Sequence, residues 1–130
     1  MSLPHHKLIA WQRADDLFIA VHRTTHQHFP REEKYELGTQ LRKSAYSVPA
    51  NIVEGNARST TRDTIKFFNI ASSSLSETGY GLHAARRLGY LSDAAYAALE
   101  AQVKGVAAPL NVLIRQKRAT LVARARRERA

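Results

Sequence analysis

Residues 41–58, LRKSAYSVPANIVEGNAR, decide the fold of this chain. Apolar residues recur here at intervals of four, three and four, the period of one helical face. They are Leu41, Ala45, Val48 and Ile52. Pro49 lies inside the pattern, although proline removes a backbone donor and disfavours a helix interior. We therefore predict a helix over about residues 33–55 that depends on packing against its neighbours.

A polar stripe runs beside this apolar face. Its members, at spacings of four, three and four, are Ser47, Asn51, Glu54 and Arg58. Glu54 precedes Arg58 by one helical turn, which suits an ion pair. Because Pro49 deprives the Ala45 carbonyl of its amide partner, we expect Asn51 or a neighbouring hydroxyl such as that of Ser44 to help satisfy that region. We interpret the stripe as a structural network that fixes helix register and subunit contacts, with direct ligand binding as the alternative.

Three further segments, at about residues 4–28, at about residues 60–88 and from about residue 92 to at least residue 118, have helical periodicity. Their predicted core residues are Leu8, Trp11, Phe18, Val21 and Thr25 in the first, Ile65, Phe68, Ala71 or Ser72, Leu75 and Leu82 in the second, and Leu99, Val103, Val106, Leu110 and Leu113 in the third. Strand patterns are weak throughout. Helices of this length joined by short loops predict an all-α, antiparallel up-down four-helix bundle.

Local signals predict where these helices begin and end. Glu32 and Glu33 favour a helix N-terminus near the start of the second segment, through the helix dipole. Gly55 or Asn56 suits a left-handed C-cap at its end. Thr60 and Ser92 are the expected N-caps of the third and fourth helices.

Composition limits the classes of protein. The chain has 130 residues, no cysteine and no apolar run near 18 residues, so we expect one cytoplasmic domain with no disulfide and no membrane contact. We assign residues 1–118 to the bundle and residues 119–130 to a basic C-terminal tail or helix extension. The first 16 residues do not resemble a secretory signal.

The net charge of +9 is concentrated near the C-terminus. Residues 115–130 hold seven Arg or Lys and one Glu, a net charge of +6. Such a segment can contact phosphates and release counterions, which predicts binding to RNA or DNA. The alternative is a solvated charged face.

The candidate nucleic-acid-binding residues come from three parts of the chain. They are Arg58, Arg62 and Lys66, then Arg86 and Arg87, then Arg115, Lys117, Arg118, Arg124, Arg126, Arg127 and Arg129. Arg115, Arg118, Arg126 and Arg129 share one face if the fourth helix continues. Assembly of several copies would multiply these patches and raise avidity.

Catalytic and metal-binding patterns are weak. His22 and His26 lie one turn apart, but no cysteine or nearby carboxylate completes a zinc ligand set. The chain has no Glu-x-x-His pair of the kind used by di-iron bundles, no phosphate-binding glycine loop and no Gly-x-Ser-x-Gly. We therefore expect no enzyme activity, no catalytic residue, no metal and no cofactor.

The motif LRKSAYSVPANIVEGNAR, followed by FFNIASSSLSE and RRLGYL, resembles the four-helix bundle family of 23S rRNA intervening-sequence proteins. The resemblance covers about residues 6–118. It extends more distantly to the accessory variability determinant of diversity-generating retroelements, a basic pentameric ring that binds reverse transcriptase and nucleic acid. The resemblance implies a homo-oligomer, specifically a pentamer, with no catalytic residues to carry over.

Two hypotheses for function follow. The first is an oligomeric accessory protein that binds RNA or DNA through basic surfaces. The second is a scaffold that binds a protein partner and is basic incidentally; the small residues of the third helix and the polar stripe of the second helix favour it. Salt-dependent binding to oligonucleotides separates the two.

Overall fold

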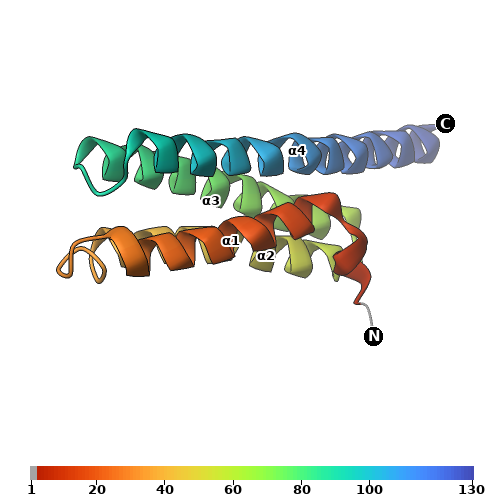
Figure 1. Ribbon diagram of the computed structural model, residues 1–130. Coiled ribbons are helices and arrows are strands. Elements are labelled where there is room, and N and C mark those ends of the chain that lie inside the picture. Colours follow the sequence, from red (N-terminus) through yellow and green to blue (C-terminus); the bar gives the residue numbers. More distant parts are fainter. Residues whose placement is uncertain (1–2) are drawn as a thin grey trace.

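The computed structural model describes residues 3–130 and contains four α-helices over that range. They are α1 (Ile9–His28), α2 (Leu37–Asn56), α3 (Thr61–Arg87) and α4 (Asp93–Arg129), preceded by a short 3-10 helix η1 (Pro4–Lys7). The helices lie side by side, with the α1–α2 and α3–α4 loops at one end and the α2–α3 loop at the other (Figure 1). No strand occurs among these residues, so the predicted all-α class with four helices is confirmed.

The N-caps predicted at Thr60 and Ser92 are confirmed. The Thr60 hydroxyl accepts a hydrogen bond from the Asp63 amide at 3.2 Å, and the Ser92 hydroxyl accepts one from the Ala95 amide at 3.1 Å. The start predicted for the second helix is wrong, because residues near Glu33 form a turn. The Glu33 carbonyl accepts from the Gly38 amide at 2.8 Å there, and α2 begins only at Leu37.

The predicted left-handed C-cap at Gly55 or Asn56 is also wrong. Both residues are helical, and the C-cap residue after them, Ala57, has right-handed geometry. Among residues 3–130, only Gly89 has a positive φ, of 80°, where the chain leaves α3. The need for glycine at position 55 therefore has another cause, which lies in the packing of α2 on α3.

Two glycines let α2 and α3 approach closely. A Cβ atom added at Gly55 would lie 2.8 Å from the Phe68 ring, and one added at Gly81 would lie 2.6 Å from Leu41 Cδ2. Both distances are too short for van der Waals contact. The Thr64 hydroxyl also donates to the Gly55 carbonyl at 2.9 Å, which ties the two helices together at this point.

The core follows the predicted stripes in α2, in α3 and in the second half of α1, where Val21 and Thr25 are buried, but not in the first half of α1. The buried residues of α1 include Ala10, Ala14 and Leu17, whereas Trp11 and Phe18 are half-buried. Small alanine side chains let α1 approach its neighbours, and the larger aromatic rings are left at the edge of the interface. In α4 the predicted residues Leu99, Val106 and Leu110 are buried, and the stripe shifts by one residue only at its end, where Ile114 is buried and Leu113 is half-buried.

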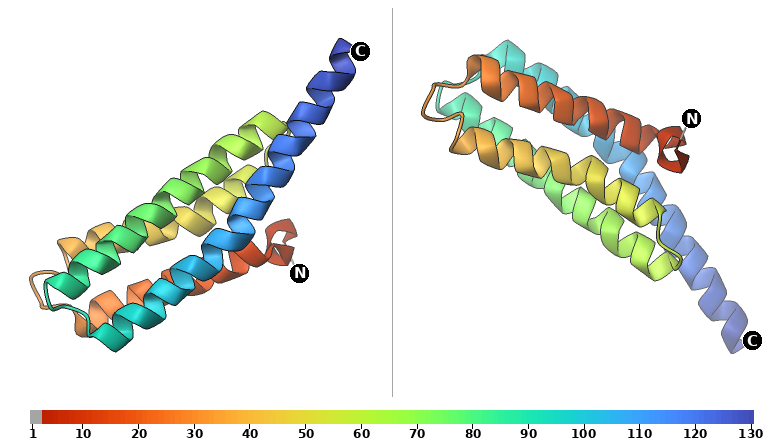
Figure 2. Two further views of the ribbon diagram at one scale, coloured as in Figure 1. Left: turned by 90° about the horizontal axis from the view of Figure 1, so that it is seen from above. Right: turned by 90° about the horizontal axis from the view of Figure 1, so that it is seen from below.

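Helix α4 is longer than its neighbours and runs on beyond them (Figure 2). It has 37 residues against 27 in α3, so at 1.5 Å per residue it is about 15 Å longer. The basic segment after residue 118 is therefore helical, as far as Arg129. Residues 115–120 are exposed, and only Leu121 and Ala125 beyond them are half-buried. Within residues 3–130, we find no helix with the length and apolarity that a membrane span requires.

Candidate functional site

A ladder of small hydroxyl side chains joins α2 to α3. The Thr78 hydroxyl donates to the Ser44 hydroxyl and lies 2.9 Å from it; the Ser74 carbonyl is also 2.9 Å away. The Ser44 hydroxyl in turn donates to the Leu41 carbonyl at 3.1 Å. Ser44, Ser74 and Thr78 are all buried, so these bonds satisfy polar groups that water does not reach.

The ladder continues into the polar stripe of α2. The hydroxyls of Ser47 and Ser74 lie 2.7 Å apart. The Asn51 amide donates to the Ser47 carbonyl at 2.8 Å and to the Ser47 hydroxyl at 2.9 Å. The expectation that Asn51 or Ser44 serves the Ala45 region is wrong, because the Asn51 side chain reaches one turn back to Ser47 and the Ser44 hydroxyl donates to the Leu41 carbonyl. No buried side-chain nitrogen or oxygen in the described part of the chain lacks a partner.

Glu54 and Arg58 stand apart from this ladder. They form the predicted ion pair, but 53% of the Glu54 side chain and 41% of the Arg58 side chain are exposed. An exposed pair at this spacing contributes only about 0.3–0.5 kcal/mol to stability. The four-residue motif thus divides into Ser47 and Asn51 in the α2–α3 seam and an exposed pair near the end of α2.

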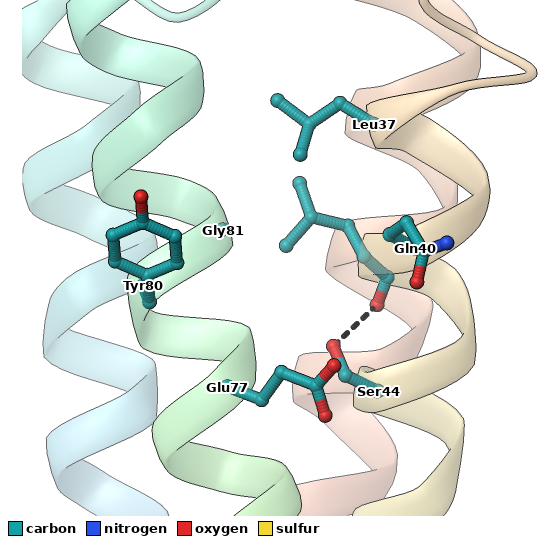
Figure 3. Close-up of a pocket in the computed structure, with 7 residues that line it drawn as sticks. Leu37, Gln40, Ser44, Glu77, Tyr80 and Gly81 are labelled. Carbon is teal, nitrogen blue, oxygen red and sulfur yellow. Dashed lines mark hydrogen bonds between the residues drawn. The ribbon is translucent and has the colours of Figure 1, made fainter.

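A pocket of about 230 Å³ opens in the same seam (Figure 3). Its lining residues are Leu37, Gln40, Leu41, Ser44, Glu77, Tyr80 and Gly81. Most of this surface is apolar, and Figure 3 shows the Glu77 carboxylate turned toward Ser44 across the opening. The pocket can hold one apolar side chain of a partner, with Glu77 available as a hydrogen-bond acceptor at its edge.

Basic residues from α3, α4 and the α2–α3 loop gather at the end of the bundle that carries this loop. Arg62 and Arg124 line one hollow of about 320 Å³ with Thr61 and Leu121. The Arg124 guanidinium donates to the Thr61 hydroxyl at 2.8 Å, and the Arg118 guanidinium lies 3.4 Å from its acceptor on Asn69. These contacts hold the basic part of α4 against the start of α3.

Arg58 and Lys66 belong to the same end of the molecule. The Arg58 guanidinium lies over the Phe67 ring, 4.5 Å from its centre, and the Lys66 ammonium lies 5.9 Å from the same centre. We call this surface the basic end. It comprises Arg58, Arg62, Lys66, Arg115, Lys117, Arg118, Arg124, Arg126, Arg127 and Arg129. Glu54, Asp63 and Glu128 are the acidic residues among them in sequence, so the surface is strongly cationic.

Arg86 and Arg87 do not join the basic end. They lie in the last turn of α3, about 36 Å along that helix from Arg62. Arg86 binds Asp93 at 2.9 Å and lies over the Tyr96 ring at 5.1 Å. The hydrogen bond to Asp93, followed by the charge of that carboxylate, raises the pKa of Arg86. Its charge is therefore partly compensated within the chain.

The histidine pair of α1 has no set of metal ligands around it. The rings of His22 and His26 lie 4.7 Å apart between centres. Partial desolvation, then the positive charge of Arg42, lowers the pKa of His26. Throughout residues 3–130, no three His, Cys, Asp or Glu side chains group closely enough to bind a metal ion.

Thr61 and Asn69 contact the basic segment but carry no signal in the sequence. They lie 63 and 49 residues before their arginine partners, and neither belongs to a charged pattern. Only the packing of α4 on α3 brings them to the basic end. The spacing of Arg58, Arg62 and Lys66, by contrast, already indicated one helical face.

Comparison with known proteins identifies the class of this bundle. The model of the 23S rRNA-intervening sequence protein family matches residues 6–112, and the chain belongs to this family. The match ends before the basic part of α4, so residues 113–130 lie outside it.

A solved structure supports the fold. The crystal structure of a protein of unknown function from the S23 ribosomal protein family of Bacteroides thetaiotaomicron is similar, with a TM-score of 0.76. The match covers 82% of this chain and 98% of that chain at 20% sequence identity, so the likeness concerns the fold. No curated protein matches the chain.

Proposed function

We propose that this protein is a non-enzymatic accessory protein that binds nucleic acid, RNA first, through the basic end. The observation that carries this proposal is the projection of α4 beyond the bundle with exposed arginines on it. The family name refers to an intervening sequence of ribosomal RNA, which makes RNA the first ligand to test. Arg86 and Arg87 are left out of the proposed contact surface because of their position and the Asp93 pair.

The proposal includes assembly in the cytoplasm into a ring-like homo-oligomer, a pentamer as the family resemblance implies. The protomer would be an antiparallel up-and-down bundle, which agrees with loops that alternate between its two ends. A ring would present several copies of the basic end to one polyanion. Binding of the second and later copies would then be intramolecular, which raises avidity without new contacts.

Phosphate contacts make the affinity depend steeply on salt. Seven basic residues in contact with duplex phosphates give a slope of log K against log salt of about −6.3. Between about 50 mM and about 200 mM salt, that slope lowers the affinity by roughly 6,000-fold. Removing four of the seven changes the slope to about −2.7 and the loss to roughly 40-fold.

The test compares two full-length variants that have lost equal charge. One carries Lys117→Gln, Arg124→Gln, Arg127→Gln and Arg129→Gln, and the control carries Arg23→Gln, Arg31→Gln, Lys43→Gln and Lys104→Gln, all at exposed positions. RNA and DNA oligonucleotides are titrated at several salt concentrations. We expect the magnitude of the slope to fall by about 3.6 in the first variant only. Equal slopes in both would mean that the basic end has no special role.

A protein-binding scaffold is the second candidate, favoured by the pocket between α2 and α3. Its apolar lining and exposed Tyr80 suit a partner side chain. Tyr80→Ala would weaken such a partner and leave oligonucleotide binding unchanged. Weak nucleic-acid binding that is screened equally in all variants would favour this function over the first.

A further inference from the structure

Helix α4 carries a second stripe on the side opposite to its core-facing residues. Taking 100° per residue, six positions lie within about 80° of one another on this outer side. They are Ala108, Val112, Arg115, Ala119, Val122 and Arg126, and we call them the outer stripe. All six are exposed, with Val112 at 40% and Val122 at 48%. A row of small apolar side chains interrupted by arginines is typical of a helix that contacts another surface.

A hollow of about 380 Å³ lies between α1 and α2 and has the opposite charge. We call it the acidic hollow; its principal lining residues are Trp11, Asp15, Phe18, Tyr46, Val53 and Glu54. The Phe18 and Tyr46 rings pack edge to face with centres 5.6 Å apart, and Tyr46 is 60% exposed. Both charged residues that line the hollow are acids.

The two surfaces are complementary in chemistry. Within the described part of the chain, Glu54 is paired with Arg58, whereas Asp15 forms no ion pair. An arginine that enters the hollow can bind the Asp15 carboxylate and lay its guanidinium over an aromatic ring. The alanines and valines of the outer stripe can then pack against the remaining ring surface.

One chain cannot join its own two surfaces. Val106, Leu110 and Ile114 are buried on the bundle side of α4, so the outer stripe faces away from the bundle. The acidic hollow belongs to α1 and α2, on a different face of the same bundle. Contact between the two surfaces therefore requires a second copy.

We propose that the outer stripe of α4 in one copy docks into the acidic hollow of a second copy. This inference rests on the proposed assembly and names the surfaces that make it. Such a contact is heterologous, because each copy offers a different surface to each neighbour, and repeated contacts close into a ring if the rotation allows. Lys117, Arg124 and Arg127 point to other sides of α4 and remain free for phosphates.

The test reverses one charge on each surface of the full-length protein. Asp15→Arg and Arg126→Asp, each alone, should weaken self-association at least tenfold, measured by sedimentation over a range of protein concentrations. The two changes together should restore most of the association. The matched controls are Glu32→Arg and Arg31→Asp, which make the same reversals at exposed residues of the α1–α2 loop. Thermal unfolding checks that each variant is folded.

Two results would overturn the inference: a parent chain that is monomeric at every concentration, or single variants that associate as strongly as the controls. Tyr46→Ser gives an independent check, because it removes ring surface without changing charge, and it should also weaken association. RNA titration of Asp15→Arg keeps the proposed function separate. Asp15→Arg retains every residue of the basic end. If this variant loses assembly but still binds RNA, both the docking inference and the nucleic-acid-binding proposal are supported. If the parent protein assembles but does not bind RNA, only the nucleic-acid-binding proposal is refuted.

Discussion

Replacement of Gly55 by alanine should destabilise the protein, although alanine favours a helix over glycine. The new Cβ would lie 2.8 Å from Cδ1 and Cε1 of Phe68 and 3.1 Å from the Thr64 carbonyl oxygen. Phe68 is 1% exposed, and Thr64 donates a hydrogen bond to Gly55 itself. Neither neighbour can move without disturbing the seam between α2 and α3.

The magnitude follows from two opposing contributions. Extra volume in a packed core costs about 1–3 kcal/mol. The higher helix propensity of alanine returns about 1 kcal/mol. The net loss is therefore about 1 kcal/mol, with about 2 kcal/mol as the upper end of the range. For a chain of 130 residues, unfolding entropy of about 2.1 cal/mol/K per residue converts this into a fall in Tm of about 4–8 °C.

The matched control is Gly105→Ala in α4. A Cβ at Gly105 meets no heavy atom within 4 Å, so only the helix-propensity gain remains. We expect a rise in Tm of about 4 °C. The change in Tm for Gly81→Ala should lie between those of the other two variants. Leu41, the side chain that the new Cβ would meet, can move into the pocket of about 230 Å³ that it lines.

The assay is thermal and urea unfolding followed by circular dichroism, at one fixed protein concentration because assembly shifts apparent stability. If Gly55→Ala is as stable as the parent while Gly105→Ala is stabilised, the close contact of α2 with α3 does not constrain position 55, and the steric reasoning is refuted.

Three smaller predictions concern other sites. Thr78→Val keeps the side-chain shape but removes the hydrogen bonds to Ser44 and Ser74, so the free energy of unfolding should fall by about 1 kcal/mol, and no change in urea unfolding would argue against the ladder. Glu54→Ala should lower the free energy of unfolding by only about 0.5 kcal/mol. In sedimentation and RNA titration, it should weaken assembly more than RNA binding. Unchanged stability and unchanged assembly would contradict a structural role for Glu54. In the folded protein the pKa of His26 is lowered below its ordinary value of 6.5. The neutral side chain therefore stabilises the fold above pH 6.5, and this stabilisation is lost as the pH falls through the folded-state pKa. Replacing His26 by glutamine should reduce the decline in Tm between about pH 7 and about pH 5.

The sequence alone determined the all-α class, the four helices and the family. These conclusions depend on local information, namely helical periodicity, the Thr60 and Ser92 caps and the motif over residues 41–58. Periodicity also identified most buried residues of α2 and α3, because large apolar side chains recur there on one face. It failed only for the first half of α1, where Ala10, Ala14 and Leu17 face the core and the aromatic residues Trp11 and Phe18 lie at its edge.

Only the tertiary structure decided the role of Gly55 and the composition of the candidate sites. A local pattern predicted a left-handed cap at Gly55, but the helix is unbroken there and the glycine makes room for Phe68, a residue of another helix. In the same way, Asn51 and Ser47 became part of the ladder because Ser74 lies across the seam, whereas Glu54 and Arg58 are exposed. Arg86 was separated from the basic end by the length of α3. Distances between helices depend on packing, and spacing along one helix does not contain them.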